Sequence, residues 1–218
     1  MALSKVNFNS MNVTPAASKA IKFNSSNNGL ETGDIGGNLV LLETKTASGD
    51  GTLDFTSGID STYKEYQFHF ANIHPATGSN FTFQADTGTN TNYNIAMTTT
   101  SVQAYHTEDN SSTGVSYKTS TDQGNGTGFQ ILTINELSNE NDGSMSGILT
   151  VYEPSSSTFV KHFIANTNHA NNSGASPTNQ QHNFIAGYFN TTTALTRFRF
   201  KMASGNIDAG TIKLYGVL

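Results

Sequence analysis

The sequence predicts an all-β protein, and three observations support that fold class. Its 218 residues include 23 serines, 30 threonines and 25 asparagines. Ser, Thr and Asn side chains compete for backbone hydrogen bonds in helices, whereas Thr and aromatic residues suit a half-buried strand surface. From Leu39 onward, short alternating runs recur every ~10–15 residues with turn signals between them, as in sandwiches and barrels. No window has a sustained helical period.

The chain is expected to divide into an N-terminal docking arm, residues 1–38, and a β-sandwich domain, residues 39–218. Short apolar islands separated by Ser, Asn and Gly mark the arm, and their candidate docking residues are Val6, Phe8, Met11, Val13, Ile21 and Phe23. These islands are too small to form a core of their own. They are expected to form short strands that dock on the main domain or on another chain, and the alternative is a partly disordered tail.

The sandwich domain is predicted to be an antiparallel, jelly-roll-like β-sandwich. Its strands are expected near residues 39–46, 51–56, 63–74, 79–86, 91–97, 101–106, 114–119, 128–136, 145–152, 158–166, 182–189, 195–203 and 210–217. The alternation places one set of residues inside, because alternate residues of a strand share a face: Phe68, Phe70, Phe81, Phe83, Phe198, Phe200, Ile212 and Leu214.

Two strand patterns carry further expectations. Arg197, Arg199 and Lys201 alternate with apolar residues, so a register slip of one residue would bury three cations. This basic row could meet an acidic partner surface, or it could be a solvated sheet face paired with Asp or Glu on the next strand. The run Leu39–Leu42 is apolar on both faces, which predicts cover from the arm or from a neighbouring subunit. We therefore expect a homo-oligomer, and a trimer in particular.

The longest break in the strand pattern covers residues 166–181 and predicts a functional surface loop. Its candidate ligand-facing residues, with one neighbour, are Asn168, His169, Asn171, Asn172 and His182. Sugar binding by a sandwich also needs an exposed aromatic ring, for which Tyr93, Tyr105, Tyr117 and Tyr188 are candidates.

Catalysis has little support in the sequence, so the protein is not expected to be an enzyme. There is no cysteine, no Gly-x-Ser-x-Gly elbow and no phosphate-binding glycine loop. The carboxylates available to a glycosidase, Glu136, Glu140, Asp142 and Glu153, lie in ordinary turn contexts. No cofactor is expected, and the six histidines lack metal-site spacing. Turns beginning at Asp122 and Asn139 supply oxygen ligands, so calcium binding in one of these turns stays open as an alternative.

Charge and hydropathy exclude two classes of partner. Eleven basic and 16 acidic residues give a net charge of −5, and no basic run occurs, which argues against nucleic-acid binding. No stretch approaches the ~18 apolar residues of a transmembrane helix, so membrane insertion is not expected. The first residues also lack the apolar segment of a signal peptide.

Four segments carry a resemblance to a known family. They are DSTYKEYQFHFANIHPATG (residues 60–78), GILTVYEPSSSTFVKHFI (147–164), IAGYFNTTTA (185–194) and the ending FRFKM (198–202) with SGNIDAGTIKLYGV (204–217). Together they resemble structural proteins of tailed, mostly aquatic bacteriophages. The resemblance covers roughly Leu39 to Leu218 and implies a jelly-roll-like sandwich on the virion surface, in a head decoration, head fibre or tail fibre. It brings no catalytic or metal residues.

The resulting hypothesis is a virion surface protein that is made in the host cytoplasm and acts by binding. Its expected partners are other virion proteins of the capsid or tail, further copies of itself, and host-surface polysaccharide. Two alternatives remain: a free carbohydrate-binding module, which should be monomeric, and a glycan-processing enzyme built on the same sandwich.

Overall fold

The computed structural model describes residues 19–34, 37–172 and 177–218. Every regular element of these residues is a β-strand, and every strand pairing is antiparallel, which confirms the prediction of an all-β antiparallel fold. In this part of the chain no helix has the length and apolarity that a membrane crossing requires. The chain divides into two compact units, Met1–Asn38 and Leu39–Leu218.

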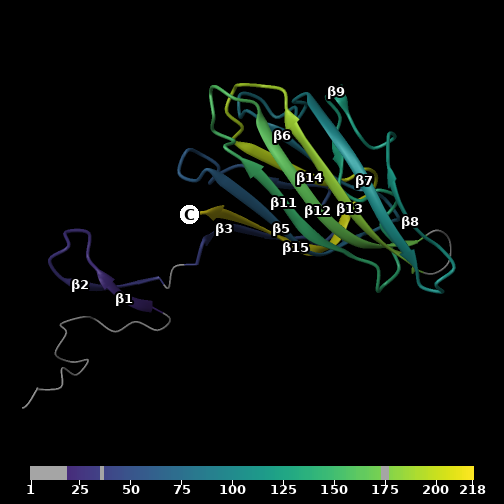
Figure 1. Cartoon of the computed structure of the whole chain (residues 1–218), viewed down its shortest axis with the longest axis horizontal. Helices are drawn as coiled ribbons and strands as arrows, with labels where there is room; N and C mark the ends of the chain where they lie inside the picture. Colours follow the sequence, from purple (N-terminus) through teal and green to yellow (C-terminus); the bar gives the residue numbers. More distant parts are fainter. Residues whose placement is uncertain (1–18, 35–36, 173–176) are drawn as a thin grey trace, which may run out of the picture. The chain divides into compact units, whose positions relative to one another are not determined.

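The strands follow one another along the chain as shown in Figure 1. They are β1 (Lys19–Phe23), β2 (Leu30–Asp34), β3 (Leu39–Thr46), β4 (Leu53–Phe55), β5 (Glu65–Pro75), β6 (Phe81–Asp86), β7 (Met97–Thr107), β8 (Thr113–Tyr117), β9 (Gly124–Gly126), β10 (Gln130–Ile131), β11 (Met145–Tyr152), β12 (Lys161–Asn172), β13 (Pro177–Phe189), β14 (Arg197–Met202) and β15 (Ile207–Val217).

Unit 1 contains a hairpin of β1 and β2. Its register pairs Phe23 with Leu30 and Lys22 with Glu31. Since alternate residues of a strand share a face, Ile21 and Phe23 lie with Leu30 on one face, while Lys22 and Glu31 form an ion pair of 3.5 Å on the other. The hairpin is therefore amphipathic. The arm residues Val6, Phe8, Met11 and Val13 lie outside the described residues.

Unit 2 consists of two antiparallel sheets. The smaller has the strand order β10-β6-β14-β4, and the larger has the order β3-β15-β5-β11-β12-β13-β7-β8, with β9 also pairing with β7. Figure 1 shows the long strands β5, β11, β12, β13 and β7 side by side. The two sheets pack face to face in a sandwich-like arrangement, because one hydrophobic core is built from the inward residues of both.

Phenylalanines make up much of this core. The rings of Phe68 on β5 and Phe200 on β14 lie 5.0 Å apart, and those of Phe83 on β6 and Phe163 on β12 lie 5.1 Å apart. All eight residues predicted to point inward are at most 4% exposed, which confirms the predicted register of their strands. Aromatic pairs of this kind contribute about 0.5–1.5 kcal/mol each beyond their area burial.

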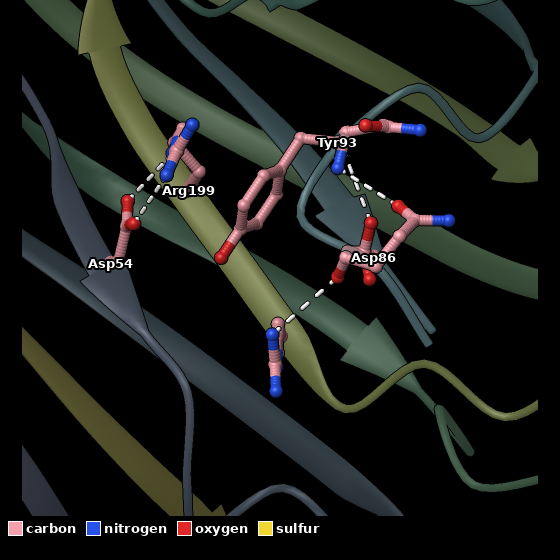
Figure 2. Close-up of polar contacts among 7 residues, drawn as sticks. Asp54, Asp86, Tyr93 and Arg199 are labelled. Carbon is pink, nitrogen blue, oxygen red and sulfur yellow. Dashed lines mark hydrogen bonds and ion pairs between the residues drawn. The ribbon is translucent and has the colours of Figure 1, made fainter. Parts of the chain in front are cut away.

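The basic row of β14 lies on the outer face of the smaller sheet, as its alternation predicts. Arg199 donates from Nε and Nη2 to the carboxylate of Asp54 on β4, at 2.8 and 2.6 Å. The residue opposite on the next strand is thus acidic. The row is not simply solvated, however, because the ring of Tyr93 lies 4.1 Å from the Arg199 guanidinium (Figure 2).

The prediction of a strand at residues 91–97 is wrong. This segment is a loop that covers the smaller sheet, and Tyr93 within it is 2% exposed. The Tyr93 N–H donates to the Asp86 carboxylate at 3.2 Å (Figure 2), and its φ is 48°. A positive φ of this kind does not fit a strand ladder, and the Tyr93 N–H is bonded to a side chain rather than to a neighbouring strand.

Two other predicted boundaries need correction. The strand expected at residues 128–136 is limited to β10, and Asn135, beyond it, has a φ of 66°. The surface loop expected at residues 166–181 is instead the paired ends of β12 and β13, in register from Lys161–Phe189 to Asn171–Asn179. The strands expected at residues 158–166 and 182–189 thus extend further than predicted, and these ends were missed because their inward residues are polar.

The two-sided cover expected for Leu39–Leu42 is not provided within unit 2. Strand β3 is an edge strand of the larger sheet, paired only with β15 in the described residues. Leu42 packs against the core, but Leu39 and Leu41 are 40% and 52% exposed. One face of this run is therefore half-buried and the other is open.

Candidate ligand site at the polar end of the sandwich

The inner face of the larger sheet changes from apolar to polar along its length. On β12 the inward residues Phe163 and Ala165 belong to the core, whereas the next inward residues, Thr167, His169 and Asn171, are polar and at most 7% exposed. Strands β7 and β13 change in the same way, with Gln103, Gln181 and Asn183 buried at this end. Buried polar groups are costly unless they find partners, so this end of the sandwich has a role other than core packing.

A cavity of about 800 Å³ opens at this polar end. It is lined by Asn80, Gln103, Tyr105, Lys118, Ser120, Thr121, Ile131, Asn135, Glu136, Asn171, Asn179 and Gln181. The volume lies within the ~300–1,000 Å³ that small-molecule sites occupy. Strands β7, β12 and β13 form one wall, and the segment that follows β10 forms part of the other.

Four of the lining amides hold one another in place. Gln181 accepts hydrogen bonds from Gln103 and, at 3.1 Å, from Asn135, and it donates to Asn179 at 2.9 Å. Gln103 also donates to the carbonyl of Ile134 at 3.2 Å. The cavity wall is therefore organised before any ligand arrives.

Other lining groups have no side-chain partner in the part of the chain that the structure describes. Asn171 is 7% exposed, and its side chain makes no hydrogen bond within the described residues. The Glu136 carboxylate and the Lys118 ammonium likewise form no ion pair or side-chain hydrogen bond there. These groups can donate to, or accept from, a molecule that enters the cavity.

A buried polar layer continues from the cavity toward the core. Asn183 donates to Thr167 at 3.1 Å, and its Nδ2 also lies 3.1 Å from Nδ1 of His169. His169 Nε2 and Asn183 Oδ1 have no partner among the described residues. Burial lowers the pKa of His169 to about 4, because a charged imidazole loses its hydration there.

The structure separates the predicted ligand-facing residues. His169 and Asn171 point inward, and only Asn171 lines the cavity. Asn168 and His182 lie opposite each other in the register, on the outer face of the same sheet. Asn172 is the last residue of β12, and its side chain lies outside what the structure describes.

The four candidate tyrosines are also dispersed. Tyr105 lines the cavity, and its ring packs against Gly114 of β8, where an added Cβ would lie 2.8 Å from the ring. Tyr93 is buried against Arg199 on the smaller sheet, while Tyr117 and Tyr188 lie on strands at the outside of the larger sheet. Tyr105 is thus the tyrosine that the cavity brings together with the amides.

Sequence reasoning missed the glutamines at the centre of the site. Gln103 and Gln181 stand at inward positions of β7 and β13. The neighbours of Gln103 along β7, Val102 and Ala104, are apolar, so the available signal there was an inverted alternation with the polar residue inward. Gln181 lies between Gln180 and His182 and carried no such signal.

The carboxylates considered for catalysis do not gather. Glu136 lines the cavity, Glu153 pairs with Lys64 at 3.1 Å, and Glu140 and Asp142 belong to the turn before β11. Among the described residues no group of three or more His, Cys, Asp or Glu side chains could hold a metal ion. In the turn considered for calcium, the Asp122 carboxylate accepts a hydrogen bond from the Tyr117 hydroxyl.

Comparison of the chain with protein-family models, curated proteins and solved structures finds no match in any of the three.

Proposed function

We propose that the protein is a structural component displayed on the surface of a bacteriophage particle, as a capsid decoration or a fibre subunit. Unit 1 docks on a neighbouring virion protein, and unit 2 carries the displayed sandwich. The sequence resemblance supports this proposal, as does the composition. A cysteine-free, Thr- and Asn-rich β-domain can fold in the host cytoplasm without disulfides and needs none after release.

The observation that carries the docking proposal is the apolar face of the β1–β2 hairpin. Ile21, Phe23 and Leu30 share this face and are 39%, 71% and 38% exposed. A two-stranded hairpin is marginally stable by itself in water, and three neighbouring apolar side chains favour contact with a partner. The hairpin can pack its apolar face on a virion protein or add its edge to an exposed sheet.

Two finer features belong to the proposal. The sandwich of unit 2 is of the jelly-roll type, and the protein assembles as a homotrimer. The open face of β3 supports self-assembly, because a neighbouring copy would cover Leu39 and Leu41 at an otherwise exposed sheet edge.

The second proposed act is adhesion to host-surface polysaccharide, which the amide-lined cavity supports. The same cavity would serve a free carbohydrate-binding module, so particle association separates the two proposals. Neither proposed act is catalytic, and neither requires a cofactor.

Particle incorporation tests the docking role. The double variant Ile21→Asp/Phe23→Asp places two carboxylates on the apolar face, and the control Lys22→Ser/Glu31→Ser changes the opposite face of the same hairpin. We expect the control chain to copurify with particles at normal occupancy and the double variant to be lost from them. Equal incorporation of both variants would refute hairpin docking.

A further inference from the structure

We propose that the cavity at the polar end of the sandwich binds a neutral saccharide. This inference rests on the adhesive part of the proposed function and names its site and ligand class. It is independent of hairpin docking, because all the lining residues belong to unit 2.

The chemistry of the wall matches a polyhydroxylated ligand. Six of the lining side chains are amides: Asn80, Gln103, Asn135, Asn171, Asn179 and Gln181. An amide has both donor and acceptor groups, so amides that face the cavity can pair with sugar hydroxyls, which also donate and accept. Asn80 and Gln103 already donate to two protein acceptors each, so their side-chain oxygens are the groups left for a ligand. A wall of carboxylates or ammonium groups would favour ions instead.

The formal charges of the cavity point to a neutral ligand. Lys118 and Glu136 are the two ionisable side chains of opposite charge in the lining, so they balance each other. An anionic ligand would meet the Glu136 carboxylate, and a cationic ligand would meet the Lys118 ammonium. A neutral saccharide can hydrogen-bond to both groups, and hydrogen bonds to charged groups are the stronger ones.

Asn171 provides the most specific indication of a ligand. Its backbone is fixed by the pairing with Asn179 and by a bridge to Leu137. The residue is 7% exposed, its side chain lines the cavity, and it has no hydrogen-bond partner among the described residues. An amide that faces the cavity without a protein partner can donate to, and accept from, a ligand hydroxyl.

Preorganisation and an aromatic surface complete the site. Gln103 and Gln181, which are 1% and 2% exposed, are already fixed by hydrogen bonds, so they lose little freedom on binding. The Tyr105 hydroxyl hydrogen-bonds with Ser112 at 3.1 Å, and its ring rests on Gly114. This half-buried ring can contact the C–H groups of a sugar.

Saturation-transfer NMR and calorimetric titration of the intact chain test the inference. The probes are the neutral tetrasaccharides of glucose, mannose, galactose and N-acetylglucosamine, with tetragalacturonate as the charged comparison. The cavity variants are Asn171→Ala and Asn179→Ala. The control is Asn168→Ala, which changes the same residue type on β12 but on the opposite face of the sheet.

We expect at least one neutral tetrasaccharide to bind, with affinity weakened about tenfold or more by each cavity variant and unchanged by Asn168→Ala. If Asn171→Ala does not fold, the half-buried Asn179 position still decides the question. The inference is wrong if no neutral probe binds at millimolar concentration, if only tetragalacturonate binds, or if the cavity variants bind as the parent does. A variant that loses saccharide binding but still enters particles would support the cavity site without affecting the docking proposal.

Discussion

The Arg199 guanidinium on β14 donates two hydrogen bonds to the Asp54 carboxylate on β4. The two residues are 145 positions apart in the chain. Asp54 fixes the plane of the guanidinium, and the ring of Tyr93 lies on it at 4.1 Å. Each of these side chains is about three-quarters buried or more. One cation thereby connects two strands and the loop that covers them.

Replacement of this arginine by lysine should be costly. Arg199→Lys keeps the charge but loses the planar fork and the stacking on Tyr93, so we expect a loss of about 1–2 kcal/mol in the free energy of unfolding. The matched control is Arg197→Lys, since the Arg197 side chain donates to the carbonyl of Asn90 at 3.4 Å and pairs with no carboxylate among the described residues, and it should change stability by less than about 0.5 kcal/mol. Urea denaturation followed by circular dichroism measures both, and equal effects would contradict the prediction.

The phenylalanine core gives a second prediction. Phe198→Ala or Phe200→Ala should each reduce the free energy of unfolding by about 3–5 kcal/mol, because both rings are fully buried between the sheets. Phe159→Ala is the control, since that ring is 66% exposed, and should cost less than about 0.5 kcal/mol. A loss below about 1 kcal/mol at either core position would contradict the packing described for the sandwich.

The buried His169 predicts a loss of stability in acid. Its pKa falls from 6.5 to about 4 on folding, so the unfolded chain binds more protons between these values. The contribution to stability is fully present above pH 6.5, is lost as the pH falls, and levels off below about pH 4, with a total of about 3 kcal/mol. Across this pH range the denaturation midpoint should depend less on pH in His169→Gln than in the parent chain. The exposed-site control His106→Gln should keep the pH dependence of the parent. An unchanged slope in His169→Gln would show that other groups cause the acid sensitivity.

Self-assembly through β3 is testable at one side chain. We expect light scattering to show a trimer at micromolar concentration and Leu41→Asp to shift it to monomer, because the substitution places a charge on the open face of β3. Val115→Asp is the control, since Val115 lies on β8 at the opposite edge of the same sheet and is 75% exposed. A monomeric parent chain, or dissociation by both variants, would argue against a β3 interface.

Removal of residues 1–38 separates docking from folding. The core cluster is built entirely from unit 2, so the remaining chain 39–218 should stay soluble with the far-ultraviolet spectrum of a β-protein. It should no longer enter particles, because the exposed apolar face of the hairpin is gone. If the truncated chain enters particles at normal occupancy, the sandwich itself and not unit 1 attaches the protein to the particle.

Alternation in the sequence predicted the fold wherever one face of a strand meets the apolar core. The spacing of Phe198 and Phe200 between Arg197, Arg199 and Lys201 determines which face of β14 is buried, and the structure has the same register. Burying cations without partners would cost far more than any gain from an alternative pairing.

Alternation of apolar and polar residues did not predict the strand ends whose inward residues are polar. Thr167, His169 and Asn171 on β12 face a hydrogen-bonded layer and a cavity, so a test for inward apolar residues cannot detect that end of the strand. The strand prediction around Tyr93 failed for a different reason. The Tyr93 N–H donates to the buried Asp86 carboxylate, and the local sequence does not reveal this contact. The amide site depends on residues brought together from β7, β12, β13 and the segment after β10, which no local motif could indicate.

The placement of β15 has a consequence for the order of folding. This strand lies between β3 and β5 in the larger sheet, and β14 lies between β6 and β4 in the smaller one. In the described residues β3 and β4 therefore have no sheet neighbour, and β5 and β6 lack one of theirs, until the last strands have left the ribosome. Such non-local pairing is slow. During synthesis β3 and β5 expose unpaired edges that favour aggregation. A chain that ends before Ile207 should therefore collect in inclusion bodies, because the edges of β3 and β5 stay unpaired.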